Sequence, residues 1–160
     1  MYIRVILNGI EFMTATSHAI VGSVIAAKIG NPALAVPIAL ASHLVLDSIP
    51  HWDTATNGHG KRDTRVFINT MFDFVLGLVL SYFVLIFLFP TTSLSYAFFI
   101  IITAQLFDWL TVPYLFFRIK FFFSYVYKFQ KLFDRKLASP WGIITQIATV
   151  IAIVVIGKLI

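Results

Sequence analysis

The chain has 160 residues, of which 59% are hydrophobic and only 12% are charged, and its mean hydropathy is +0.91. Because roughly a quarter of the residues in a soluble domain are charged, this composition excludes an ordinary soluble domain and indicates an integral membrane protein. The absence of cysteine excludes disulfides and thiolate metal ligands, and we interpret the net charge of +5 first as a determinant of membrane orientation.

Five apolar stretches follow one another along the chain. Residues 14–29 and 32–49 are short and rich in alanine, glycine and serine, which is typical of a tightly packed helical hairpin. Residues 66–89, 94–117 and 141–160 each reach the roughly 20 apolar residues that a membrane-spanning helix needs. The sequence therefore predicts an all-α fold, a single polytopic transmembrane domain of about five helices.

Residues 118–139 alternate basic with aromatic side chains and separate the fourth stretch from the fifth. This pattern predicts an amphipathic helix that lies in the membrane interface and attracts anionic lipid headgroups. Proteins that bind single-stranded nucleic acid also interleave basic and aromatic residues. Because the segment lies between two apolar spans, we favour the lipid bilayer as its partner and expect no nucleic acid.

The basic residues are distributed unevenly between the two sides that five spans would define. Ten lysines and arginines fall on the side of the N-terminus, residues 51–65 and residues 118–139, whereas Lys28 and Lys158 fall on the other side. The positive-inside rule then predicts a cell-membrane protein with its N-terminus in the cytoplasm. Residues 1–12 do not resemble a signal peptide, because Glu11 interrupts the apolar run.

Ionisable residues from four of these stretches are expected at a similar depth on the cytoplasmic side. His18 opens the first helix, His43 and Asp47 lie in the last two turns of the second, Asp73 lies about two turns into the third, and Asp108 lies near the end of the fourth. A carboxylate inside an apolar span is costly and is therefore a functional candidate. The spacing of His43 and Asp47 places both side chains on one helical face.

Two further candidates, His51 and Asp53, follow Pro50, which ends the second helix and lets them fold back over it. Histidine with aspartate, without cysteine, is a common ligand set for divalent metals. The sequence therefore predicts a divalent metal ion, zinc first with manganese or iron as alternatives, and its candidate ligands are His18, His43, Asp47, His51 and Asp73. Asp53 and Asp108 are the candidate catalytic carboxylates that would accept a proton from a metal-activated water.

Residues 13–18 (Met-Thr-Ala-Thr-Ser-His) and 42–53 (Ser-His-Leu-Val-Leu-Asp-Ser-Ile-Pro-His-Trp-Asp) resemble the membrane-bound metal-dependent hydrolases of bacteria, a family of small polytopic proteins. The pattern H-x3-D-x2-P, closed by a histidine, is also similar to part of the zinc sites of zinc-dependent phospholipase C. The resemblance covers about 40 residues and implies that His43 and Asp47 bind zinc, with His18 matching the early histidine of the membrane family. The chain lacks that family's Pro-Asp-x-Asp motif, and Asp73 and Asp108 are candidates to supply the missing carboxylates.

These observations favour a membrane hydrolase that acts on a phosphoester or lipid-like substrate at the cytoplasmic face. Two alternatives stay open. A membrane scaffold would use the histidines and aspartates only to pack helices against one another. An ion transporter would need polar residues that continue towards the other side, where the sequence offers only Ser81, Gln105 and Gln146.

Overall fold

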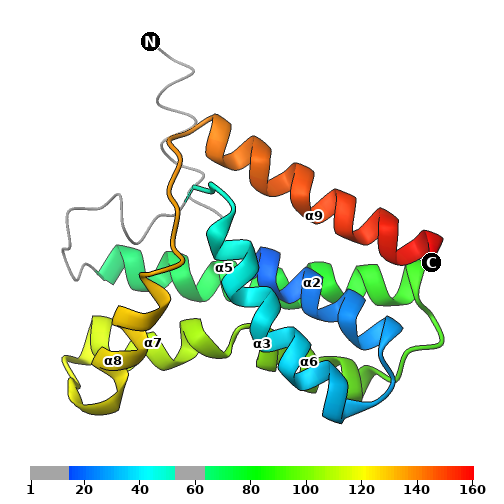
Figure 1. Cartoon of the computed structure of the whole chain (residues 1–160), viewed down its shortest axis with the longest axis horizontal. Coiled ribbons are helices and arrows are strands. Elements are labelled where there is room, and N and C mark those ends of the chain that lie inside the picture. The colour runs from blue at the N-terminus through cyan, green and yellow to red at the C-terminus, as the bar shows by residue number, and fades with distance from the viewer. Residues whose placement is uncertain (1–14, 53–63) are drawn as a thin grey trace.

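The computed structural model describes residues 15–52 and 64–160. Within these ranges the chain forms helices and no strand. An isolated bridge between His51 and Lys136 joins two of the segments that lie between helices. The predicted all-α fold is therefore confirmed. Figure 1 shows the helices, which are α2 (Ala15–Lys28), α3 (Pro32–Ser48), α5 (Thr64–Leu88), α6 (Leu94–Ala104), α7 (Leu106–Phe117), α8 (Phe121–Gln130) and α9 (Trp141–Leu159).

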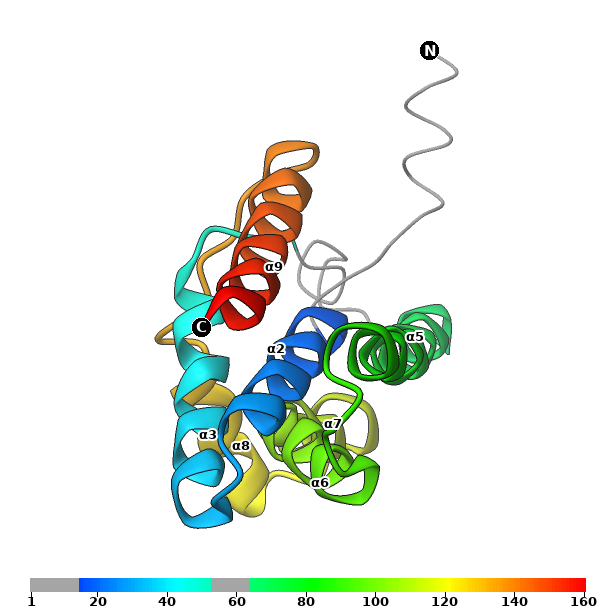
Figure 2. The same ribbon diagram turned by 90° about the vertical axis from the view of Figure 1, so that its right-hand side faces the viewer.

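Helix α2 lies at the centre of the molecule and contacts α3, α5, α6 and α9, which surround it (Figure 2). Its small residues allow these close approaches. A Cβ atom added at Gly22 would lie 2.9 Å from the Cβ of Ala104 in α6, and one added at Gly77 of α5 would lie 3.0 Å from the Cβ of Ala19. The small-residue packing expected of residues 14–29 is thus used against α5 and α6 as well as against α3.

Two helices are long and apolar enough to cross a membrane, namely residues 66–88 of α5 and the whole of α9. Helices α6 and α7 count as a third span if the pair, bent by 50°, is taken as one. The two N-terminal helices form where the sequence predicted them but contain only 14 and 17 residues. At 1.5 Å per residue, α2 is about 21 Å long, which is short of a hydrocarbon core of about 30 Å. The described structure therefore offers two or three candidate spans where five were expected.

The break between α6 and α7 divides a stretch that the sequence predicted as one helix. The break lies at Gln105, whose side-chain amide donates a hydrogen bond to the carbonyl of Ala15 in α2 over 2.9 Å. At the same point the Ala104 carbonyl accepts a hydrogen bond from His43 in α3. Polar contacts to two neighbouring helices thus coincide with the bend, and they place α7 beside the end of α3.

The basic–aromatic segment at 118–139 is helical only in its first part, as α8. Beyond α8, the chain runs along the end of α3 towards the start of α9 (Figure 1). The Arg135 amide donates to the carbonyl of Asp47 over 2.9 Å, and the Leu137 amide donates to the carbonyl of His51 over 2.7 Å. These backbone hydrogen bonds attach the segment to the end of α3 and to the residues just after it, where the candidate ligands Asp47 and His51 lie.

Candidate metal centre

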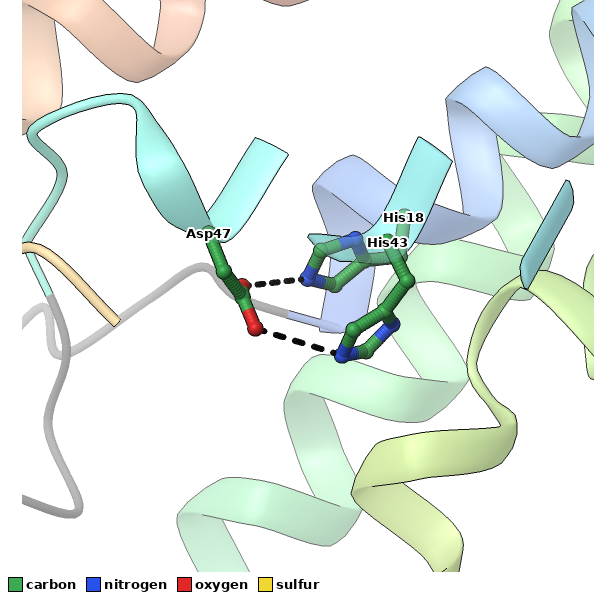
Figure 3. Close-up of side chains that lie close together, drawn as sticks. All are labelled: His18, His43 and Asp47. Carbon is green, nitrogen blue, oxygen red and sulfur yellow. Dashed lines mark ion pairs between the residues drawn. The ribbon is translucent and has the colours of Figure 1, made fainter. Parts of the chain in front are cut away.

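Three of the predicted ligands meet in the interior between α2 and α3 (Figure 3). His18 lies in the first turn of α2, and His43 and Asp47 lie on one face of α3. His18 Nε2 is 3.2 Å from Asp47 Oδ1, and His43 Nε2 is 3.4 Å from Asp47 Oδ2. One ligand atom from each residue lies within 4.8 Å of the other two, so the group could hold a metal ion. All three residues are buried, with His43 fully enclosed.

The orientation of the His43 ring is set by the main chain at the break between α6 and α7. Its Nδ1 lies 2.7 Å from the Ala104 carbonyl, which can only accept, so Nδ1 carries the hydrogen. In a neutral ring, Nε2 is then unprotonated and directs its lone pair towards Asp47. Metal-binding histidines commonly donate their second ring N–H to a backbone carbonyl in this way.

The His18 ring stacks on the His43 ring, with centroids 3.8 Å apart and planes inclined by 14°. Within the part of the chain that the structure describes, His18 Nδ1 is buried and has no hydrogen-bond partner. Two parallel imidazoles at this distance disfavour the protonation of both rings, because two buried positive charges would repel each other. The stacking therefore favours at least one neutral imidazole, which is the form that binds metals.

Asp108, predicted as a catalytic carboxylate, lies beside this group. Its Oδ1 atom is 3.5 Å from His43 Nε2, and its side chain is 27% exposed, more than any of the three buried residues. Gln130, at the end of α8, also reaches the group, with its Nε2 atom 3.1 Å from His43 Nε2. Gln130 could not be predicted from the sequence, because a single neutral amide carries neither a charge nor a spacing pattern.

Asp73, a predicted ligand, forms hydrogen bonds with the first residues of α2. Its carboxylate accepts hydrogen bonds from the Ala15 amide at 2.8 Å and from the Thr16 hydroxyl at 2.6 Å. It is not one of the three residues whose ligand atoms meet. Its assignment as a ligand stays a prediction, and its position is that of a carboxylate stabilising a helix N-terminus.

His51, the remaining predicted ligand, points towards a second polar cluster. Its Nδ1 donates to the Ile49 carbonyl over 2.9 Å, and its Nε2 lies 3.7 Å from Asp134 Oδ1. Lys131 and Lys136 also pair with Asp134. The structure therefore does not place His51 among the meeting ligand atoms, and its ligand role stays a prediction. The other predicted catalytic carboxylate, Asp53, lies outside the described residues.

A small open cavity of about 20 Å³ adjoins the metal group between α2, α3 and α9. His18 and Asp47 form part of its wall, together with His51. The rest of the wall combines apolar side chains such as Leu46 and Val150 with a few polar ones. At this size the cavity holds about one water molecule beside the group that could bind a metal.

The donor atoms fit a divalent cation. Two imidazole nitrogens and a carboxylate form a ligand set that zinc, manganese and iron accept. The fixed lone pair of His43 Nε2 faces oxygens of both Asp47 and Asp108, at 3.4 and 3.5 Å. Three acceptor atoms this close repel one another unless a positive charge or a donated hydrogen lies between them.

No protein-family model, curated protein or solved structure matches this chain.

Proposed function

We propose that this chain is a membrane-embedded, metal-dependent hydrolase that acts on a phosphoester or lipid-like substrate. The observation that carries the proposal is the buried group of His18, His43 and Asp47, in which a backbone hydrogen bond fixes one imidazole lone pair towards a carboxylate. A group with this composition is expensive to bury without a cation. It would hold zinc, or alternatively manganese or iron, through the two Nε2 atoms and the Asp47 carboxylate.

When bound, a divalent ion acts as a Lewis acid that makes a water molecule more acidic and polarises the bond to be hydrolysed. Asp108 is the residue we propose to accept the proton. Among the described residues its Oδ2 atom is buried and has no hydrogen-bond partner, although the side chain as a whole is partly exposed. A carboxylate with one free oxygen, beside the metal group, can accept a proton and pass it to water. Asp53 is the second candidate for this role.

The proposed substrate class follows from the surroundings of the group. Nearby, α8 exposes the aromatic rings of Phe121 and Tyr125 together with Lys128, a combination that suits the headgroup region of a bilayer. Six of the twelve basic residues lie between residues 118 and 136, in and beside α8, and this cluster supports a cytoplasmic location.

Elemental analysis of the full chain, purified in detergent and supplied with zinc, manganese or iron, tests the proposal. We expect close to one equivalent of metal in the wild type and a loss of at least about 90% in His43→Ala and in Asp47→Ala, because removal of one ligand leaves too few to hold the ion. Asp134→Ala is the matched control, since it removes a carboxylate of similar burial outside the group.

A wild type that retains none of the three metals would leave the histidines and aspartates as a packing network and favour the membrane-scaffold hypothesis. If metal is retained, hydrolysis of phosphomonoesters, phosphodiesters and lipid phosphates should be lost in the same two variants. Hydrolysis that persists in His43→Ala would contradict the catalytic assignment.

A further inference from the structure

Four polar atoms converge on one side of the metal group, next to α7 and α8. They are His43 Nε2, Asp47 Oδ2, Asp108 Oδ1 and Gln130 Nε2. From the Gln130 nitrogen the distances are 2.9 Å to Asp108, 3.1 Å to His43 and 3.3 Å to Asp47. From His43 Nε2 the two carboxylate oxygens lie at 3.4 and 3.5 Å. The Gln130 amide thus occupies the point where three acceptors meet.

The amide nitrogen of Gln130 has only two hydrogens, and three acceptors surround it. Two of those acceptors belong to carboxylates, and the third is the fixed lone pair of His43. The partly positive NH2 group therefore supplies positive charge to all three acceptors. Two hydrogens cannot satisfy three acceptors at once, so one acceptor receives no hydrogen from this amide.

The two ends of a glutamine amide have nearly the same shape, and rotation about its last bond exchanges them without moving the main chain. After that rotation, the Gln130 oxygen would join three other donor atoms around one point. Ligands at about 2.1 Å from an ion are about 3.4 Å apart in a tetrahedron and about 3.0 Å apart in an octahedron. His43 Nε2 and the Gln130 nitrogen lie 2.9–3.5 Å from each other and from the oxygens of Asp47 and Asp108, which is close to these edges.

We infer that Gln130 is a ligand of the divalent ion and binds it through its side-chain oxygen, with Asp108 Oδ1 as a further ligand. In the structure the same amide has its NH2 group turned inwards, where it donates to both carboxylates. This inference rests on the proposed function and refines its metal site. Asp108 then binds through one oxygen and keeps Oδ2 available for a proton.

The added ligands change which ion the site should prefer. The buried group alone supplies two imidazole nitrogens and one carboxylate, a set that suits zinc. Asp108 and Gln130 raise the number of oxygen ligands to three, and carboxylate and carbonyl oxygens suit harder ions such as manganese. We therefore assign manganese as the ion for which Gln130 matters most.

Titration of the full chain in detergent with Mn²⁺ tests this assignment, with free Mn²⁺ measured by its electron paramagnetic resonance signal. We expect Gln130→Leu to raise the dissociation constant at least about tenfold, because it removes a ligand at similar size. Gln130→Glu should lower the constant at least about threefold, because it replaces a neutral oxygen by a charged one. Ser124→Ala is the matched control on the same helix, since its hydroxyl bonds only the Phe121 carbonyl, and it should change the constant less than about twofold.

Tryptophan fluorescence melting shows whether each variant is folded, and Gln130→Glu keeps the test valid if the leucine variant does not fold. Dissociation constants within about twofold of the wild type for both Gln130 variants, with binding abolished in His43→Ala, would overturn the role of Gln130 and leave the proposed function in place. A wild type that binds neither Mn²⁺ nor Zn²⁺ would overturn both.

Discussion

Replacement of Asp73 decides between two roles for this buried carboxylate, and the two roles predict different results. The structure shows it accepting hydrogen bonds from the Ala15 amide and the Thr16 hydroxyl, at 2.8 and 2.6 Å, where α2 begins. If Asp73 were instead a metal ligand, its replacement would weaken metal binding. Because α2 is the central helix and carries His18, its first turn matters for both the fold and the site.

The size of the stability effect follows from these two hydrogen bonds. A hydrogen bond to a charged group contributes about 1.5–3 kcal/mol net, so two contribute about 3–6 kcal/mol. We expect Asp73→Ala to lower the free energy of unfolding by that amount, and Asp73→Asn by about half as much, because asparagine keeps one acceptor oxygen without the charge. For a chain of this size, 3 kcal/mol corresponds to a fall of at least about 6 °C in the melting temperature.

Melting followed by tryptophan fluorescence in detergent measures the first effect, and Mn²⁺ titration measures the second. Thr16→Val serves as the partial control, since it removes only the hydroxyl donor and should cost about 1–2 kcal/mol. We expect Asp73→Asn to change the Mn²⁺ dissociation constant less than about twofold. If Asp73→Asn lost its metal and kept its melting temperature, the helix-capping argument would be refuted and Asp73 would be a ligand.

Two further predictions concern close approaches of the main chain. Gly142→Ala should lower the free energy of unfolding by about 1–3 kcal/mol, because the added Cβ would lie 2.7 Å from the Trp52 amide nitrogen. Gly30→Ala is the control and should change this free energy by less than about 0.5 kcal/mol, because nothing lies within 4 Å of its added Cβ. Equal melting temperatures for the two variants would contradict the close packing at Gly142. Gly22→Leu should separate α2 from α6 and lower the melting temperature further, because even its Cβ would lie 2.9 Å from that of Ala104; an unchanged melting temperature would show that the two helices are not in contact.

Local sequence patterns determined much of the helical framework. Pro32 and the Asn31 side chain, which accepts from the Ala33 amide, define the start of α3, and the chain leaves the helix just before Pro50, as expected. The pairing of His43 with Asp47 was also predictable, because residues four apart share one face of any helix. These features depend only on residues that are close together along the chain, so they can be read from the sequence directly.

The number of spans was harder to predict from hydropathy. Residues 14–29 are apolar enough to suggest a membrane-spanning helix, yet α2 is short and enclosed by four other helices. Hydropathy records that a segment avoids water, and it does not distinguish burial in lipid from burial in protein. The bend at Gln105 has the same origin, since it coincides with contacts to Ala15 and His43 that no local pattern specifies.

Some residues of the site could be predicted from the sequence, and others were identified only by the tertiary structure. The sequence by itself predicted that histidines and aspartates would gather at one end of the bundle, because His18 lies at the start of one helix and His43 and Asp47 lie near the end of the next. Only the tertiary structure decided that Asp73 caps α2 and that Gln130, 87 residues after His43, reaches its ring. The physical reason is that side-chain contacts between helices depend on how closely and at what angle the helices pack, which is settled by the whole set of surrounding side chains.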